Sequence, residues 1–446
     1  MEGVTSSIQD MQTALGCGRE TPQTLAEKAL ARANSNPGKN VYLSLDRQMA
    51  MEAAIACEKN FASLPKPPLY GLPISLKDCF DLAAYPTTCG SRYYAEQNGI
   101  AVSDSAVAKR LRAQGAVITG KTHMQQLAYG ITGENQDYGD CLQPMNAAWL
   151  TGGSSSGAAA SVQEGSAIAA IGTDTGGSLR LPAAMCGLAS YRASWTVAQE
   201  LGLWSGAMHL APSFDTLGCI FSYLRDAPIL GQGLFGLQPA ANVEPRALVG
   251  MAMNPFLEDC DAAVLEGFAQ WRTTLRGLGA NLLPVDLDFW EEASSLFGMI
   301  QAKEAAKLHA EHTKGDFSPF EPRIAERLAW GASLPEARIA LQRKGHEAFR
   351  QRMDTLLRTY EYLIVPCSPI ARLMAGADHR ESRVRILRYT TPMSLAGVPV
   401  ITLPCRNGAG VQLVAACGAD ARLLAYAAKL GTALAKEGRA SRACSC

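Results

Sequence analysis

Three short segments of this sequence contain residue types at spacings that could carry out chemistry. Residues 115–122 (GAVITGKT) match the glycine–lysine pattern of a phosphate-binding loop. Residues 153–157 (GSSSG) match the G-x-S-x-G pattern around an esterase nucleophile. The longer run 152–182 (GGSSSGAAASVQEGSAIAAIGTDTGGSLRLP) joins a glycine- and serine-rich stretch to a second Gly-Gly-Ser. These patterns predict different activities, and the elements around each one decide between them.

The phosphate-loop pattern lies in an unsuitable context. Such a loop follows a strand and wraps its backbone N–H groups around a phosphate. Here residues 116–119 (AVIT) are expected to form a buried strand themselves. The preceding residues 104–114 should form a helix whose N-cap is Ser103 or Asp104. We therefore do not expect Lys121 to bind a nucleotide.

The esterase pattern would make Ser155 the nucleophile of a serine hydrolase. That arrangement needs an apolar strand directly before the serine, and an acidic residue and a histidine elsewhere in the chain. Residues 143–152 (QPMNAAWLTG) have the composition of a loop, and His379 is one of several histidines that could serve. An α/β-hydrolase-type esterase that uses Ser155 stays open as an alternative.

The third run is similar to the signature of the amidase signature family of serine amidohydrolases. Its second half, residues 172–182, reads Gly-Thr-Asp-Thr-Gly-Gly-Ser-Leu-Arg-x-Pro. Residues 71–78 (GLPISLKD) resemble the lysine segment of the same family, and residues 210–218 and 394–399 match it more weakly. The resemblance extends from about residue 22 to 435.

The resemblance implies a role for each matching residue. Ser178 matches the family nucleophile, Lys77 the general base, and Ser154 the serine that follows a cis peptide bond and relays the proton. No metal and no organic cofactor are implied. The remaining assignments are the oxyanion hole at the N–H groups of Thr175, Gly176 and Gly177, and the site scaffold at Gly153, Ser155, Asp174 and Arg180.

These residue types suit the hydrolysis of a linear carboxylic amide, with release of ammonia or an amine. A serine hydroxyl attacks a carbonyl only when a base accepts its proton, and the attack produces an acyl-enzyme. Lys77 can accept a proton only if burial keeps it neutral. Gly176 and Gly177 lack a Cβ, so successive N–H groups can converge on one oxygen.

Strands alternate with helices along the chain, which predicts an α/β protein. Residues 22–33 should form an amphipathic helix with Thr21 as its N-cap. Lys77 should lie near the end of a strand, and residues 166–172 should form a strand that leads to Ser178. The family resemblance implies a central mixed β-sheet covered by helices on both faces.

We expect one amidase domain over residues 1–446, with the signature core at about 70–220 and a less patterned insertion at about 235–320.

Lys+Arg and Asp+Glu both number 41, so the formal net charge is zero and no nucleic-acid partner is expected. The 13 cysteines, without a signal peptide or a CxxC pair, indicate reduced thiols in a cytoplasmic protein. No stretch is apolar for long enough to span a membrane, and a homodimer stays open.

The resemblance leaves the substrate open. Family members act on small aliphatic and aryl amides, peptide and fatty acid amides, ureas, and glutamyl or glutaminyl precursors on tRNA. Residues 128–135 (AYGITGEN) favour a stand-alone amidase for small molecules. The alternative is an amidotransferase component that makes ammonia from glutamine for a tRNA-linked partner. Substrate contacts are expected from residues 125–135, 195–210 and 370–390.

A group of arginines lies in the last of these segments. It could hold an acidic group of the substrate, although we favour the interpretation that it forms a solvated helix face. Its members are Arg372, Arg380, Arg383, Arg385 and Arg388.

Overall fold

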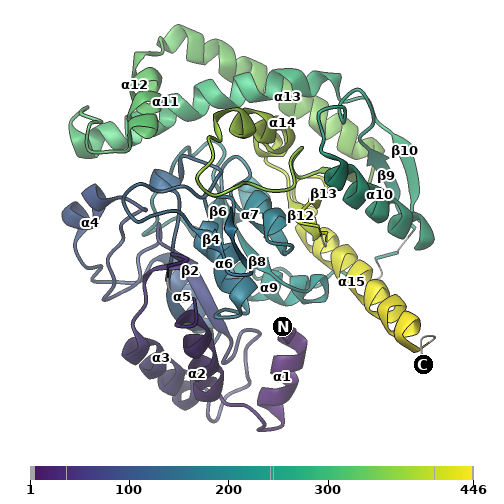
Figure 1. Cartoon of the computed structure of the whole chain (residues 1–446). Helices are drawn as coiled ribbons and strands as arrows, with labels where there is room; N and C mark the ends of the chain where they lie inside the picture. The colour runs from purple at the N-terminus through teal and green to yellow at the C-terminus, as the bar shows by residue number, and fades with distance from the viewer. Residues whose placement is uncertain (1–5, 37, 242, 245, 406, 444–446) are drawn as a thin grey trace.

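One large β-sheet runs through the protein and is flanked by helices (Figure 1). The structure is a computed structural model, and it describes residues 6–36, 38–241, 243–244, 246–405 and 407–443. Within these residues, an 11-stranded sheet is accompanied by a separate two-stranded pair, β4 (Leu142–Gln143) and β5 (Asn146–Leu150). In spatial order, the strands of the large sheet are β1 (Tyr42–Ser44), β3 (Val117–Thr122), β2 (Pro73–Lys77), β6 (Ala169–Asp174), β8 (Thr216–Phe221), β7 (Ala189–Arg192), β12 (Val400–Pro404), β13 (Gly410–Val414), β11 (Tyr362–Pro366), β9 (Leu248–Met251) and β10 (Asn281–Pro284).

The sheet is mixed, as the family resemblance implied. Strand β2 is parallel to both β3 and β6, whereas β6 runs antiparallel to β8 from Ala169 to Asp174. Every residue of β2 and β6 is buried. Strands that are covered on both faces are apolar on both faces, and these two strands end at the residues with which the candidate site begins, Lys77 and Asp174.

The helices form contiguous layers against this sheet. Helices α6 and α7 contact each other and the middle strands, while α5, α9 and α15 form another connected group. Helix α11 contacts α12, α13 and α14, and these helices lie together at one end of the molecule (Figure 1). The α-helices are α1 (Ile8–Gly16), α2 (Pro22–Ala33), α3 (Arg47–Asn60), α4 (Arg92–Asn98), α5 (Ala106–Ala113), α6 (Ser156–Glu164), α7 (Arg180–Met185), α8 (Trp195–Glu200), α9 (Ala227–Phe235), α10 (Ala262–Gly277), α11 (Ala293–Thr313), α12 (Pro322–Ser333), α13 (Glu336–Thr359), α14 (Arg380–Ala396) and α15 (Asp420–Ala443).

Helix α5 begins later than the sequence predicted. Its N-cap is Ser105, whose Oγ accepts a hydrogen bond from Ala108 N at 3.3 Å, and not Ser103 or Asp104. Asp104 Oδ1 instead accepts a hydrogen bond from Ala83 N at 2.9 Å. The local sequence offered three capping residues in a row, and a contact with a distant loop selects among them.

Residues 235–320 contribute to the same sheet and to the helical end of the molecule. They contain β9, α10, β10 and α11. Strand β9 is parallel to both β10 and β11, so this segment extends the sheet that holds Lys77. Helix α11 brings residues of this segment toward the carboxyl end of β6, where the candidate site lies.

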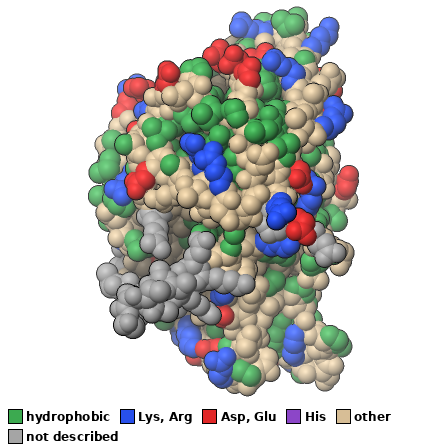
Figure 2. Space-filling model, turned by 90° about the vertical axis from the view of Figure 1, so that its right-hand side faces the viewer, with side chains coloured by type: hydrophobic (Ala, Val, Ile, Leu, Met, Phe, Trp, Pro, Cys, Tyr) green, Lys and Arg blue, Asp and Glu red, His purple; other side chains and the backbone are tan. Residues whose placement is uncertain are grey.

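The surface carries charges of both signs. On the face shown in Figure 2, Lys and Arg side chains are interspersed with Asp and Glu. The described helices include none with the length and apolar character needed to cross a bilayer.

Candidate active site

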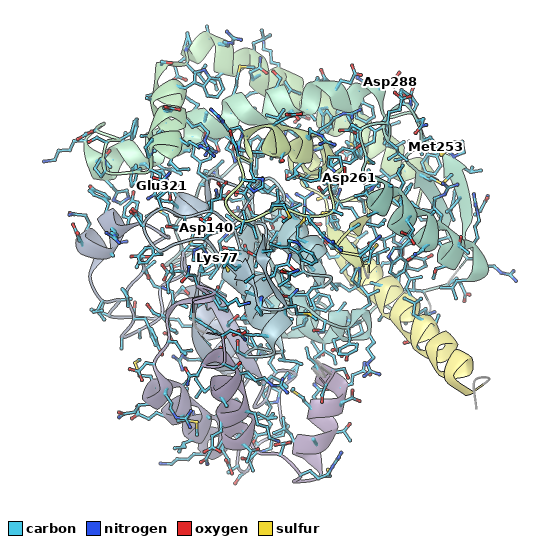
Figure 3. All side chains as sticks on the ribbon, viewed as in Figure 1. Lys77, Asp140, Met253, Asp261, Asp288 and Glu321 are labelled. Atoms are coloured by element: carbon cyan, nitrogen blue, oxygen red, sulfur yellow. The ribbon has the colours of Figure 1, made fainter. Side chains whose placement is uncertain are left out.

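Lys77 is the last residue of β2 and lies in the middle of the molecule (Figure 3). Its Nζ donates to Ser154 Oγ and to Thr173 Oγ1, both at 2.8 Å. The side chain is fully buried, and this burial lowers the pKa of Lys77 from 10.5 to about 8, although the charge of Asp174 opposes the shift. A lysine with this pKa is partly neutral near pH 8 and can accept a proton.

Ser154 lies in a loop that is fixed by backbone hydrogen bonds just before α6. The peptide bond between Gly153 and Ser154 is cis. Gly153 N donates to Ile131 O at 2.8 Å, and Ser154 O accepts from Gln125 N at 3.1 Å. The next residue, Ser155, donates its N–H to Ser178 O at 3.1 Å. These bonds place the backbone of Ser154, which binds Lys77, directly beside the backbone of Ser178.

Ser178 lies in the turn between β6 and α7, which we call the Ser178 turn (residues 174–180). Ser178 is 4% exposed and lines a small cavity. Gly177 has a φ of +118°, a conformation that side chains rarely allow, and a Cβ there would lie 2.8 Å from Thr390 Cβ. The turn therefore requires glycine at this position for both its backbone conformation and its contact with α14.

A buried carboxylate organises the Ser178 turn. Asp174 accepts hydrogen bonds from Gly177 N at 2.9 Å and Leu179 N at 3.1 Å, and it pairs with Arg180 at 2.8 Å and with Arg192 at 3.3 Å. Burial alone would raise the pKa of Asp174, but the charges of Arg180 and Arg192 and their hydrogen bonds hold it well below its usual range. The carboxylate thus stays ionised and fixes the backbone on both sides of Ser178.

Arg180 connects the same turn to other parts of the fold. Its guanidinium is fully buried and donates to Asp174, to Thr390 O at 2.8 Å and to Gln412 Oε1 at 2.7 Å. A further bond joins it to Ser394 Oγ at 2.9 Å. The planar guanidinium can satisfy several acceptors at once, so one side chain ties the turn to α14 and β13.

The backbone of residues 175–177 is held from two further directions. Thr175 Oγ1 donates to Asp215 Oδ1 at 2.6 Å, and Thr390 Oγ1 donates to Gly176 O at 2.6 Å. The carbonyl of Gly176 and the N–H of Gly177 belong to one peptide group, and Thr390 and Asp174 bind it from its two sides, so the orientation of this peptide plane is fixed.

The cavity beside Ser178 is narrow and has a mixed lining. Its volume of about 20 Å³ is room for about one water molecule. A larger pocket of about 460 Å³, the outer pocket, shares Arg383 with it. The small cavity is lined by residues 128–131, Gly176, Ser178, Gln301, Arg383 and Leu387.

The five arginines between positions 372 and 388 point in different directions. Arg383 is the member that lines the cavity beside Ser178, which differs from the solvated helix face that we favoured. The other four contact protein groups: Arg372 lies over the Trp149 ring, 4.0 Å from its centroid, Arg380 pairs with Asp378, and Arg385 and Arg388 pair with Asp259.

The key residues of the two competing motifs, Ser155 and Lys121, are buried and bonded to other protein groups. Ser155 is fully buried and its Oγ donates to Thr173 O at 3.1 Å. No histidine among the described residues forms a hydrogen bond with Ser155, so the elbow-type arrangement lacks its base. Lys121 lies within β3, as the strand prediction for this segment requires, and its Nζ pairs with Asp78 at 2.8 Å. Both charges of that pair are fully buried, so Lys121 is not free to bind phosphate.

Sequence reasoning missed several residues of this site. Thr173 lies inside the signature run, near the end of β6, and β6 is parallel to the strand that ends at Lys77, so its place in the run was a usable signal. Gln301 gave none, because it lies far along the chain and reaches the cavity only through the packing of α11. Residues 195–210, expected to contact substrate, do not line the cavity beside Ser178.

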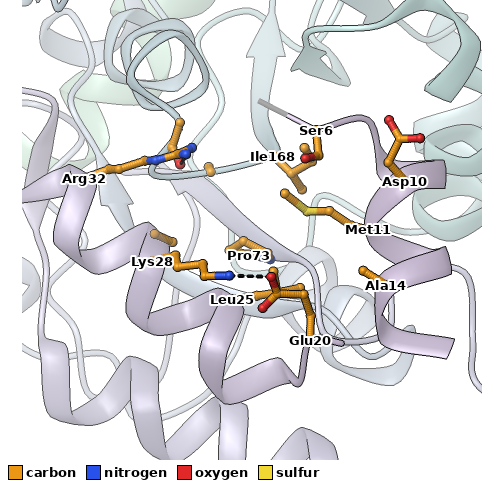
Figure 4. A pocket seen from close by; sticks show the side chains of 13 residues that line it. Ser6, Asp10, Met11, Ala14, Glu20, Leu25, Lys28, Arg32, Pro73 and Ile168 are labelled. Atoms are coloured by element: carbon orange, nitrogen blue, oxygen red, sulfur yellow. Dashed lines mark hydrogen bonds and ion pairs between the residues drawn. The ribbon is translucent and has the colours of Figure 1, made fainter. Parts of the chain in front are cut away.

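Another pocket lies between α1, α2 and the beginning of β2 (Figure 4). Its volume is about 280 Å³, and Lys28 and Glu20 form an ion pair in its wall. It includes none of the predicted site residues. Among the described residues, no group of three or more His, Cys, Asp or Glu side chains is arranged to hold a metal ion. We therefore take the cavity beside Ser178 as the candidate active site.

Comparisons with known proteins agree with the fold and the sequence pattern. The sequence profile of the amidase family matches residues 24–424. The chain is 27% identical to AtzE, the 1-carboxybiuret hydrolase component of Pseudomonas sp. (strain ADP), over 90% of this chain and 93% of that protein. It is also 27% identical to GatA, the corresponding component of the glutamyl-tRNA(Gln) amidotransferase of Roseiflexus sp. (strain RS-1), over 91% of each chain.

A solved structure shows the same relationship in three dimensions. The crystal structure of an amidase superposes on this chain with a TM-score of 0.86 and 30% sequence identity. The match covers 96% of this chain and 99% of that one. Since the family profile and the structural likeness both extend over nearly the whole chain, the protein belongs to the amidase signature family of hydrolases.

Proposed function

We propose that the protein hydrolyses a linear carboxylic amide through an acyl-enzyme on Ser178 and releases ammonia or an amine. The observation that carries this proposal is the state of Lys77. Its Nζ is fully buried, lies 2.8 Å from Ser154 Oγ, and has a pKa lowered to about 8 by burial. A lysine in this state can act as a base at a pH where an ordinary lysine cannot.

The proposed proton path runs from Ser178 through Ser154 to Lys77. As Ser178 Oγ attacks the carbonyl carbon, Ser154 accepts its proton and passes its own to neutral Lys77. The proton then returns through Ser154 to the leaving nitrogen, and the C–N bond breaks. Water attacks the acyl-enzyme by the same path in reverse. The hydrogen bond from Ser155 N to Ser178 O supports this path, because it holds the two serine segments together.

The oxyanion is proposed to bind to backbone N–H groups of the Ser178 turn. Donors that are fixed before the reaction stabilise the developing charge without reorganisation. The N–H of Gly177 already donates to Asp174 Oδ1 at 2.9 Å, so we assign the main part to Thr175 and Gly176. The hydrogen bond of Thr175 Oγ1 would hold the Thr175 side chain, and the bond to Gly176 O would hold the peptide group that follows Gly176, so both N–H groups lie between fixed neighbours.

A fluorophosphonate probe tests the proposal directly. The wild-type protein should be labelled at pH 8 on Ser178, as mapped by peptide mass spectrometry, and the Ser178→Ala variant should not be labelled. The Ser155→Ala variant is the matched control and should be labelled like the wild type, because among the described residues the Ser155 hydroxyl forms a hydrogen bond only with Thr173 O. Labelling of Ser155, or labelling that persists in Ser178→Ala, would contradict the proposal.

A second candidate function follows from the comparisons. The identity is 27% both to the glutamyl-tRNA(Gln) amidotransferase component and to the carboxybiuret hydrolase component. In the first role, the chain would release ammonia from glutamine for a partner protein. The two functions differ in a simple assay: a stand-alone amidase hydrolyses small amides as the purified chain, whereas a dependent component releases ammonia from glutamine only with its partner present.

A further inference from the structure

The cavity beside Ser178 contains two polar side chains that no protein group engages. Gln301, from α11, is only 6% exposed, and Arg383 extends from α14. Within the described part of the chain, neither side chain has a hydrogen bond or an ion pair. Gln301 is nearly buried and Arg383 is half-buried. Polar groups withdrawn from water are usually paired in folded proteins, so two unpaired side chains that line the same small cavity point to a site that a ligand completes.

Arg383 differs in this respect from its neighbours in the outer pocket. That pocket also contains Arg323, Arg327 and Arg380. All three are engaged: Arg323 pairs with Asp378 at 3.4 Å, Arg327 Nη1 donates to Tyr129 O at 2.6 Å, and Arg380 also pairs with Asp378. The free guanidinium is therefore the one that reaches the cavity of Ser178.

None of the four described acidic residues of the outer pocket forms an ion pair with Arg383. One of them, Glu326, acts on Arg380 instead. Glu134 accepts from Thr132 Oγ1 at 2.7 Å, Asp140 from Asn135 N at 3.0 Å and Glu321 from Gln136 N at 2.8 Å. These bonds hold the carboxylates against the surrounding loops, by a side-chain hydroxyl at Glu134 and by backbone N–H groups at Asp140 and Glu321. Burial lowers the pKa of Arg383, and among the described groups Tyr129 opposes this shift. An anion in the cavity would supply the missing partner.

We propose that Arg383 and Gln301 form a carboxylate-binding subsite, and that the substrates are small amides that carry a carboxylate group. This inference rests on the proposed function, because the subsite adjoins Ser178. A guanidinium binds a carboxylate through two parallel N–H bonds, and the Gln301 amide can donate a third. Ser178 and Arg383 line the same small cavity, and Arg383 also lines the outer pocket of about 460 Å³. The carboxylate would therefore lie where Arg383 joins the two spaces, a few carbon atoms from the scissile carbonyl at Ser178.

Matched pairs of amides test the subsite through hydrolysis. Malonamate, succinamate and glutaramate differ in spacer length, and each has a neutral counterpart in which methyl replaces carboxylate: propionamide, butyramide and valeramide. Ammonia release should give a kcat/KM that favours the best anionic amide over its counterpart by about 100-fold, as expected for a charge-assisted pair. The Arg383→Gln variant should reduce this ratio to about 1, mainly through KM, and Arg383→Lys should retain part of it.

Arg385→Gln is the matched control for the loss of one positive charge. Arg385 lies on the same helix, but its Nη2 donates to Asp259 O at 2.5 Å and it lines neither cavity. This variant should keep the wild-type ratio. An equal loss of preference in Arg385→Gln and Arg383→Gln would show a general effect of charge and would overturn the proposal.

A binding measurement separates this proposal from the proposed hydrolysis. Calorimetry with Ser178→Ala protein should show binding of at least one of the three anionic amides, and Arg383→Gln in the same background should weaken it at least about tenfold. No binding of any of the three, or equal binding by both proteins, would overturn the subsite. Arg383-dependent binding without any hydrolysis by the wild type would retain the subsite and refute the amidase proposal.

Discussion

Two surfaces meet at the cavity beside Ser178. The polar side chains of one are paired with other protein groups, and those of the other, among the described residues, are not. On the Ser178 turn, Asp174 and Arg180 are fully buried and each has several protein partners. On the facing surface of α11 and α14, Gln301 and Arg383 have no side-chain partner among the described residues. The first surface is complete without a ligand, whereas the second is complete only with one. We infer that the first surface sets the reaction and the second selects the substrate.

The largest test of this division is Lys77→Met. The proposal gives Lys77 the role of base, so kcat/KM should fall about 1000-fold, within the range for general acid–base catalysis. Met has a similar length and no charge, so the free energy of unfolding should not fall, because a buried charge is removed together with its desolvation cost. Ammonia release and urea denaturation would measure the two effects. Loss of activity that merely follows loss of folded protein would refute the assigned role.

The next test replaces a buried arginine of the Ser178 turn. Arg180→Gln leaves Asp174 with one of its two cations and removes bonds to α14 and β13. Breaking a buried ion pair from one side typically costs about 3–5 kcal/mol. Urea denaturation should therefore show a free energy of unfolding that is lower by about this amount.

Arg383→Gln is the counterpart on the facing surface. It removes a guanidinium that has no described protein partner, so the free energy of unfolding should change by less than about 0.5 kcal/mol. If Arg383→Gln destabilises the protein as much as Arg180→Gln does, the contrast between the two surfaces is wrong.

The pH profile tests the chemical side of the division. Lys77 acts as a base only when neutral, so kcat/KM should rise about tenfold per pH unit below its pKa of about 8 and level off above it. The rate of labelling by a fluorophosphonate should follow the same curve. The Lys77→Met variant should lose this inflection in its residual activity. A profile that is flat or falling between about pH 6 and 9 would contradict a neutral lysine base.

The smallest effect on activity is expected where the two surfaces touch. Thr390→Val removes the hydroxyl that donates to Gly176 O at 2.6 Å. The buried carbonyl then lacks this partner, which should lower the free energy of unfolding by about 1–2 kcal/mol and reduce kcat several-fold. Thr391→Val is the control, since Thr391 Oγ1 bonds only within α14, to Leu387 O. Equal effects of both substitutions would show that the contact between Thr390 and the Ser178 turn contributes no more to stability and kcat than a hydrogen bond within α14.

The same division separates what the sequence could predict from what it could not. Strand β2 with Lys77 at its end, β6 before Ser178, and α2 with Thr21 as its N-cap follow from local patterns and are present in the structure. These patterns work because capping, alternation and glycine turns depend on neighbours in the chain. Of the residues that were carried over from the resemblance, Lys77 and Asp174 lie on these strands. The others lie in the Ser178 turn and in the loop before α6.

The facing surface could not be predicted in this way. Gln301 lies in a helix and Arg383 in a group of five arginines, and neither has a local feature that distinguishes it. Their importance arises from which side of α11 and α14 faces the cavity, and from the absence of acidic partners around them among the described residues. Both facts depend on packing between segments that are far apart in the sequence. The N-cap of α5 was misplaced for the same reason, because Asp104 bonds to Ala83 in another loop.

The facing surface also consists of separate pieces of chain. Residues 128–131 come from a loop, Gln301 from α11, and Arg383 and Leu387 from one side of α14. The side chains of Gln301 and Arg383 form no hydrogen bond with another described residue, whereas a change at Arg180 affects several bonds at once. Libraries at positions 301, 383 and 387 should therefore yield many folded enzymes with new substrate ranges, and libraries within residues 174–180 few. We therefore expect the substrate range of this protein to change readily through the residues of α11 and α14, and hardly at all through the Ser178 turn.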